Sequence, residues 1–200
     1  MSQRDEIAAL IQQLADPVSH QRQKAAEEIF QQGMKLTAAV IAKWLEDEEL
    51  AKLFVIGEFR TVEATVGLAV APENFSRIHT ANGSPRLANV PPDQDAEEFE
   101  LHFGSGARLD VLTTKDSGGT GAIARFLQKF GEGIQQIEFL VREVDGATEI
   151  LRAKYRQEPT YAQTRAGADG TRVNFFLVSN PQGGKVLIEL VEAAAKTPRE

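Results

Sequence analysis

The chain has 200 residues, of which 42% are hydrophobic and 26% are charged, as in an ordinary globular protein of one or two domains. Its net charge of −7 argues against a nucleic-acid-binding protein, which needs a basic face. The absence of cysteine excludes disulfides and thiolate metal sites, and it fits a cytoplasmic protein. No apolar run approaches the roughly 20 residues that span a bilayer, and the start lacks a signal segment, so we expect no membrane contact.

Residues 1–56 carry apolar side chains at helical spacing and predict a small all-α N-terminal domain. We expect a second helix to begin at Asp16-Pro17, an N-cap followed by proline, and to end at Gly33. Thr37 is expected to cap a third helix, and a short fourth helix follows. We interpret this region as a packing or interaction domain, which could support a homodimer or bind a protein partner.

From residue 61 the hydrophobic pattern changes to the alternation of β-strands. Residues 61–70 predict a strand and 72–79 a helix, and the GSG turn at 104–106 closes a β-hairpin. After a helix at 122–130, the order repeats as strand, helix, strand pair and final strand. The sequence therefore predicts an α+β fold with two tandem βαβββ modules behind the helical domain. The modules are 61–115 and 122–193, within one domain at 61–193.

The hairpin register predicts which residues of the first module share a face, because side chains alternate along a strand. Closing the turn at 104–106 places Glu100 opposite Asp110 and His102 opposite Arg108. These four polar residues then share one face, and the apolar residues between them share the other. We expect the polar face to line a cleft and the apolar face to pack against helices.

The second module is expected to present a polar face to the same cleft. Arg172 and Asn174 on one strand are expected to share this face with Glu189 on the next. On strand 134–141, Gln136 is expected to face the cleft together with Glu138. Its neighbour Gln135 should then face the helices or the seam between the modules.

Two long segments resemble a known family. GAIARFLQKFGEGIQQIEFLV, followed by GTRVNFFLVSNPQGGKVLIELVE, is similar to the second half of the methylmalonyl-CoA epimerases, which belong to the vicinal oxygen chelate (glyoxalase) superfamily. The similarity covers residues 121–192, is weaker across 61–112 and is absent from the N-terminal helices. It implies that the two modules pair into an open half-barrel, with a divalent metal held in the cleft by their first and last strands.

The resemblance also implies roles for individual residues. Glu189 occupies the position of the glutamate ligand in the last strand, and Asp110 occupies the equivalent position in the first module. Both are candidate catalytic residues, with Glu189 as ligand or base. The two histidine ligands of the family fall on Gln136 and near Thr65, so both are replaced. The candidate metal ligands are therefore Asp110, Gln136 and Glu189.

The sequence leaves open whether the cleft holds a metal. Its carboxylates could converge on a divalent cation, with Mn, Mg, Co and Zn as candidates. Alternatively, they pair with Arg108 and Arg172 in a metal-free cleft, or they are solvated on an exposed face. We favour the metal-free cleft because both histidines are missing. The residues expected to line the cleft are Thr65, Glu100, His102, Arg108, Glu138, Arg172 and Asn174.

The resemblance implies an isomerase, epimerase or lyase that abstracts a proton next to the carbonyl or thioester group of a small molecule. The alternative is a module that binds a small molecule, or a partner, on the same scaffold without chemistry. The loss of both histidines favours this alternative.

Overall fold

The computed structural model describes residues 3–57, 60–181 and 183–193. Its N-terminal part consists of the helices α1 (Gln3–Gln13), α2 (Ser19–Leu45) and α3 (Glu48–Leu53). Among the residues described in these ranges, no helix is both long and apolar enough to span a membrane.

Helix α2 is one continuous helix of 27 residues, so the predicted break between Gly33 and Thr37 is wrong. Gly33 is buried inside the helix, where an added Cβ would lie 2.6 Å from Cγ2 of Val66. Because glycine has no side chain at this position, the helix can pack closely against the sheet. Gly33 does not end the helix. The hydroxyl of Thr37 donates to the carbonyl of Met34 within the same helix, at 3.4 Å.

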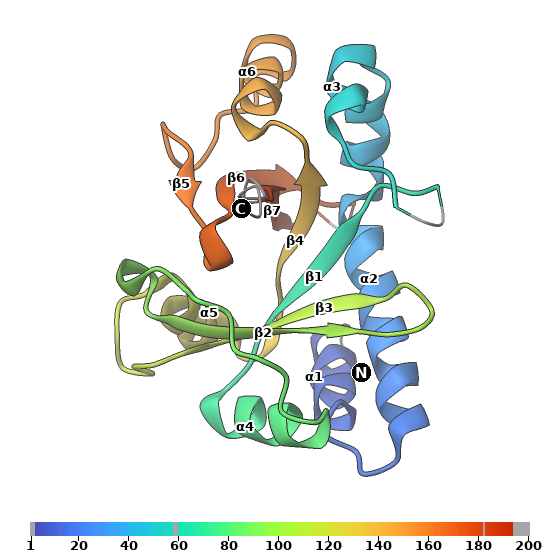
Figure 1. Cartoon of the computed structure of the whole chain (residues 1–200), viewed down its shortest axis with the longest axis vertical. Coiled ribbons are helices and arrows are strands. Elements are labelled where there is room, and N and C mark those ends of the chain that lie inside the picture. Colours follow the sequence, from blue (N-terminus) through green and yellow to red (C-terminus); the bar gives the residue numbers. More distant parts are fainter. Residues whose placement is uncertain (1–2, 58–59, 182, 194–200) are drawn as a thin grey trace, which may run out of the picture.

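The rest of the chain forms a seven-stranded sheet with the order β2-β3-β1-β4-β7-β6-β5. The sheet is curled, and its strands run in divergent directions (Figure 1). The first module comprises β1 (Ala64–Ala69), α4 (Pro72–Ala81), β2 (Ala96–His102) and β3 (Arg108–Thr114). The second module comprises β4 (Gly133–Val141), α6 (Val144–Tyr155), β5 (Arg165–Ala166), β6 (Arg172–Ser179) and β7 (Lys185–Glu192).

Between the modules lies α5 (Ala122–Phe130), and two short 3-10 helices, η1 (Pro92–Gln94) and η2 (Ala168–Gly170), lie in loops. In each module the first strand pairs in parallel with the last, and the antiparallel pair β1–β4 joins the modules at the centre of the sheet. This arrangement confirms the predicted α+β class and half-barrel. In the first module, a loop that contacts the edge strand β2 follows α4, with the backbone N–H of Ala88 donating to the carbonyl of Glu98 at 2.9 Å.

The N-terminal helices share one hydrophobic core with both modules. The ring of Trp44 on α2 packs edge-on against Phe176 of β6, and that of Phe54 packs against Phe139 of β4. The apolar faces of the helices are therefore used on the chain's own sheet. The domain boundary between residues 56 and 61 stays a prediction.

The predicted hairpin register is confirmed. Glu100 pairs with Asp110, and His102 pairs with Arg108. The alternate residues Phe99 and Leu109 are fully buried in the core on the helix side. The polar residues of the hairpin consequently face the hollow of the sheet.

Candidate functional site

A cavity of about 570 Å³ occupies the hollow of the sheet. Its floor consists of side chains from β2, β3, β4 and β7, and thus from both modules. Its walls are the start of α5 and two loops, around residues 88–94 and 160–171. This volume is in the range of sites for small molecules.

Five carboxyl groups on four strands face this cavity, and we call them the acid cluster. Its members are Glu98 and Glu100 of β2, Asp110 of β3, Glu138 of β4 and Glu189 of β7. The register brings them together, because Glu100 lies opposite Asp110 and Glu138 lies beside Glu189. Asp110 is 5% exposed and Glu189 is 7% exposed. Glu98 and Glu138 are half-buried, and Glu100 is exposed. Buried acidic side chains are rare unless they have a function or a counter-charge.

Gln136 lies at the centre of the acid cluster. Its side-chain Nε2 donates to Oε1 of Glu138 at 3.1 Å and to Oε2 of Glu189 at 2.5 Å. Within the described part of the chain, Oδ1 of Asp110 is buried and accepts no hydrogen bond. The glutamine therefore joins two of the carboxyl groups and leaves the third with a free acceptor.

Glu98, Asp110, Glu138 and Glu189 of the acid cluster have raised pKa values. Burial, followed by repulsion from neighbouring carboxylates, raises the pKa of Glu98 to about 7. Burial also raises the pKa of Glu138 to about 8, although the hydrogen bond from Gln136 opposes the rise. The pKa values of Asp110 and Glu189 lie well above the ordinary range for the same two reasons. Part of the cluster is thus protonated at neutral pH, and part is ready to ionise.

Gly67 of β1 makes room for this arrangement. It lies between Asp110 and Gln136 in the sheet. A Cβ at this position would lie 2.6 Å from Cγ of Gln136 and 3.3 Å from Cδ1 of Leu112. The missing side chain lets Gln136 lie across β1 above the floor of the cavity.

Both glutamines of β4 line the cavity, so the prediction that Gln135 faces the helices or the module seam is wrong. The pairing of β1 with β4 shifts at this point, from Gly67 opposite Gln136 to Leu68 opposite Ile134. Gln135 is the extra residue of a β-bulge, and a bulge interrupts the alternation of side chains. Its Oε1 is buried and accepts no hydrogen bond from any described residue.

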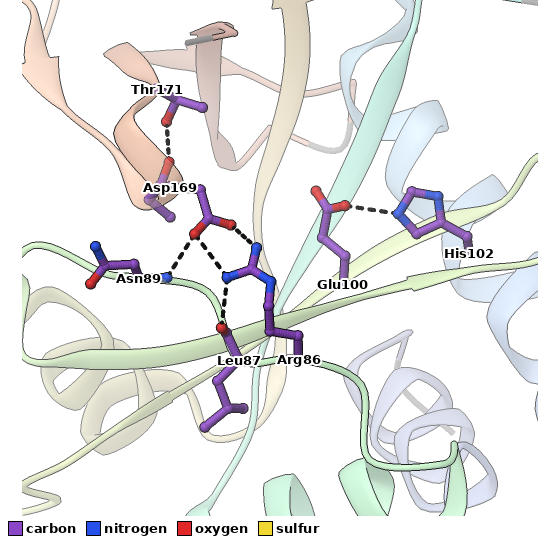
Figure 2. A network of polar contacts seen from close by, with 8 residues as sticks. Arg86, Leu87, Asn89, Glu100, His102, Asp169 and Thr171 are labelled. Carbon is purple, nitrogen blue, oxygen red and sulfur yellow. Dashed lines mark hydrogen bonds and ion pairs between the residues drawn. The ribbon is translucent and has the colours of Figure 1, made fainter. Parts of the chain in front are cut away.

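The other predicted residues of the first module lie at the edge of the site. Thr65 and Arg108 line a smaller pocket of about 220 Å³, which also borders Glu100 and Glu138. His102 is exposed, and its Nε2 lies 2.8 Å from the carboxylate of Glu100, as Figure 2 shows.

The predicted pairing of the acid cluster with two arginines is wrong. Arg108 forms its ion pair with Glu63, and Arg172 forms ion pairs with Asp145 and Glu192. None of these three partners belongs to the acid cluster. The arginines therefore neutralise carboxylates at the edge of the sheet and on its helix side.

The prediction that Arg172 and Asn174 line the cleft is also wrong. Strand β6 places Phe175 opposite Glu189, and Asn174 opposite Leu190. Phe175 therefore faces the cavity, whereas Asn174 faces α6, where its Nδ2 donates to the hydroxyl of Thr148 at 3.5 Å. Both faces of this strand carry large apolar residues, so the alternation alone did not distinguish them.

Contacts between two loops, one from each module, close the outer side of the cavity. No motif in the sequence predicts these contacts. The carboxylate of Asp169, in the turn η2 of the second module, binds Arg86 at 2.5 Å and accepts from the backbone N–H of Asn89 at 2.9 Å (Figure 2). Nearby, Arg165 pairs with Asp93 at 2.6 Å and lies over the ring of Tyr161. We call these contacts between the loops of the two modules the clasp.

No family model matches this sequence, and no curated protein does. Solved structures do match. Methylmalonyl-CoA epimerase from Mycobacterium tuberculosis is 34% identical over 66% of this chain and 87% of that chain, with a TM-score of 0.53. The chain belongs to the vicinal oxygen chelate (glyoxalase) superfamily.

Further epimerases share the fold of this superfamily member at lower identity. A variant of the Streptomyces coelicolor methylmalonyl-CoA epimerase, solved in complex with 2-nitronate-propionyl-CoA, is 23% identical over 66% of this chain and 96% of that chain, with a TM-score of 0.51. A methylmalonyl-CoA epimerase in complex with methylmalonyl-CoA and NH4+ is 23% identical over 72% of this chain and 96% of that chain, with a TM-score of 0.52. At these identities the likeness shows the fold alone.

The side chains of this superfamily member do not fit the divalent metal that the resemblance implies. Among the described residues, no group of three or more acidic or histidine side chains is arranged to hold a metal ion. Gln136 directs its N–H donors at Glu138 and Glu189, and donors of this kind oppose a cation at the same point. Thr65 stands near the position of the other histidine and lies in the smaller pocket.

Proposed function

We propose that the protein is a proton-transfer enzyme, an isomerase of the epimerase type, that binds a carbonyl-bearing small molecule in the cavity. The observation that carries this proposal is the pair of the half-buried Glu138 and the buried Glu189, held together by Gln136 on the cavity floor. The raised pKa values of these groups suit proton exchange with a weakly acidic carbon, because a catalytic acid or base works best with a pKa near the working pH.

In the proposed mechanism the carboxylate of Glu189 accepts the proton from the carbon next to the carbonyl. The C–H bond breaks, an O–H bond forms on Glu189, and negative charge develops on the carbonyl oxygen. A neighbouring carboxyl group that is still protonated donates a hydrogen bond to this oxygen, as an acid kept neutral by burial can do. Asp110 comes from the opposite module and can return a proton to the other face of the carbon, which inverts its configuration.

A divalent metal has no part in the proposed mechanism. We expect the purified protein to contain no stoichiometric metal in elemental analysis. We also expect titration calorimetry with Mn²⁺, Co²⁺ and Zn²⁺ to show no specific site. A metal content of one ion per chain would contradict this part of the proposal.

Proton exchange into the substrate tests the proposed chemistry. The protein is incubated in D₂O with methylmalonyl-CoA and with a panel of ketones and thioesters, some uncharged and some bearing an ammonium group, and deuterium at the carbon next to the carbonyl is followed by NMR. We expect exchange with at least one compound and a loss of about 100-fold or more in the E189Q variant. The control is E97Q, because Glu97 lies on β2 but pairs with Thr113 and does not line the cavity.

A binding module without chemistry is the second candidate. It is favoured by one observation, namely that neither family histidine is present at the positions of Thr65 and Gln136. In that case no compound of the panel exchanges its proton, while ligands still bind in the cavity. The exchange and binding measurements together distinguish the two functions.

A further inference from the structure

The cavity offers hydrogen-bond acceptors that have no donor. Oδ1 of Asp110 and Oε1 of Gln135 are both buried, and neither has a partner among the described residues. Both residues line the cavity, and Asp110 is 5% exposed. A buried polar atom without a partner is destabilising, so these two atoms indicate that a donor from a ligand belongs in this space.

The acid cluster also has no basic partner deep in the cavity. In the described ranges, no arginine or lysine forms an ion pair with Glu98, Asp110, Glu138 or Glu189. Two arginines line the cavity outside its floor: Arg165 pairs with Asp93, and Arg125 is exposed on α5. Among the described residues, the floor therefore contains no basic group that could stabilise the ionised form of its carboxyl groups.

Part of the wall of the cavity is apolar. Leu112 and Ile123 line it on the side of the first module, and Phe175, Leu187 and Val191 line it on the side of the second. A ligand that fills the cavity thus has a hydrocarbon or aromatic body next to its polar group. The polar group must supply donors and positive charge.

We propose that the cavity selects a small molecule with an ammonium group, whose N–H donors bind Asp110 and Gln135 and whose charge is balanced by the acid cluster. Charge-assisted hydrogen bonds of this type are roughly twice as strong as neutral ones. An anionic group, such as the carboxylate of a malonyl thioester, meets repulsion at the same place. This inference shares with the proposed function only the assumption that a ligand binds in this cavity. It adds the chemical class of that ligand.

Three probes of similar size test the inference. These are phenethylammonium, the neutral 3-phenylpropanol and the anionic 3-phenylpropionate, each titrated into the full-length protein in a calorimeter at pH 7.5. We expect phenethylammonium to bind with a Kd at least about tenfold lower than that of either other probe. The variants D110N and E189Q should each raise this Kd about tenfold or more, whereas E97Q should leave it unchanged.

Three results would overturn the inference. The first is binding of the neutral or anionic probe as tight as that of the ammonium probe. The second is no binding of the ammonium probe at millimolar concentration. The third is ammonium binding that D110N and E189Q do not weaken, provided that both variants melt cooperatively. The binding assay needs no turnover, so ammonium binding without proton exchange contradicts the proposed chemistry alone. Proton exchange without an ammonium preference contradicts only this inference.

Discussion

Asp169 and Asn89 hold the loops of the two modules together through a pair of hydrogen bonds. The backbone N–H of Asn89 donates to the carboxylate of Asp169 at 2.9 Å, and the backbone N–H of Asp169 donates to the carbonyl of Asn89 at 3.1 Å. Arg86 adds an ion pair to the same carboxylate (Figure 2). Asp169 also lines the cavity, so the clasp forms part of the wall of the site.

The first prediction concerns this clasp. Asp169 has a positive φ of 52°, so Asp169→Gly removes the side chain without backbone strain. We expect it to lower the free energy of unfolding by about 1–2 kcal/mol and to speed hydrogen exchange of the Asn89 amide. Arg86→Ala should lower it less than Asp169→Gly does, because the guanidinium is exposed and exposed ion pairs contribute little to stability.

The matched control is Arg152→Ala, which breaks the exposed pair of Arg152 with Glu158 inside the second module. It should leave the exchange of Asn89 unchanged. Unchanged exchange of Asn89 in Asp169→Gly as well would contradict the role of the clasp.

The second prediction concerns stability and pH. The pKa values of Glu98 and Glu138 are raised to about 7 and about 8, so between pH 5 and pH 8 the folded state holds protons that the unfolded state has released. The free energy of unfolding must then fall as pH rises through this range. Chemical denaturation at pH 5.5, 7 and 8.5 measures the slope.

A variant isolates the contribution of one group to this slope. Glu138→Gln removes a buried carboxyl, so it should flatten the pH dependence and raise the free energy of unfolding at pH 8.5 by roughly 1–3 kcal/mol. Glu97→Gln should keep the slope of the wild type. A stability that rises with pH between 5.5 and 8.5 would contradict the raised pKa values.

The third prediction concerns Gly67. A methyl group here meets Gln136 at 2.6 Å, so Gly67→Ala should displace that side chain from Glu138 and Glu189 and lower the free energy of unfolding by about 1–3 kcal/mol. The control is Gly133→Ala on the neighbouring strand, where an added Cβ has no atom within 4 Å. Equal stability of the two variants would show that Gln136 moves freely. Their melting curves and ligand affinities provide the comparison.

The fourth prediction uses two glycines that lie in helices. Helix propensity favours alanine over glycine by about 1 kcal/mol, and Gly146→Ala should gain part of this, since only the exposed Glu143 side chain lies nearby, at 3.3 Å. Gly33→Ala should instead destabilise the protein, because its Cβ meets Val66 at 2.6 Å and Ile137 at 3.0 Å. Urea denaturation of both variants tests this difference in sign. A stabilised Gly33→Ala variant would mean that α2 can move away from the sheet.

Sequence alone predicted the elements whose signals are local. The turn at 104–106 set the hairpin register that brings Glu100 to Asp110, and the final strand Lys185–Glu192 has the predicted bounds. It failed where tertiary packing decides. Glycine often ends a helix, but Gly33 lies inside α2 and allows the helix to pack closely against the sheet. The bulge at Gln135 depends on the pairing of β4 with β1, which lies far away in the sequence.

The clasp could not be predicted for a similar reason. Arg86 and Asp169 lie in loops of different modules, and neither residue belongs to a recognisable motif. The orientation of β6 was ambiguous, because Asn174 and Phe175 could each face the cavity by alternation alone. In contrast, four members of the acid cluster were already placed in the cleft by the sequence, namely Glu100, Asp110, Glu138 and Glu189.

Helix α2 contacts β1 and β3 of the first module as well as β4 and β7 of the second. It packs across the pair β1–β4 that joins the two modules, and it approaches these strands most closely at Gly33. Rocking of one half of the barrel against the other would require the helix to peel away from buried strands, so hinge motion at the seam is suppressed. We therefore expect a ligand of the cavity to enter and leave by movement of the loops around residues 88–94 and 160–171, which carry the clasp, and not by movement of the strands that form the floor.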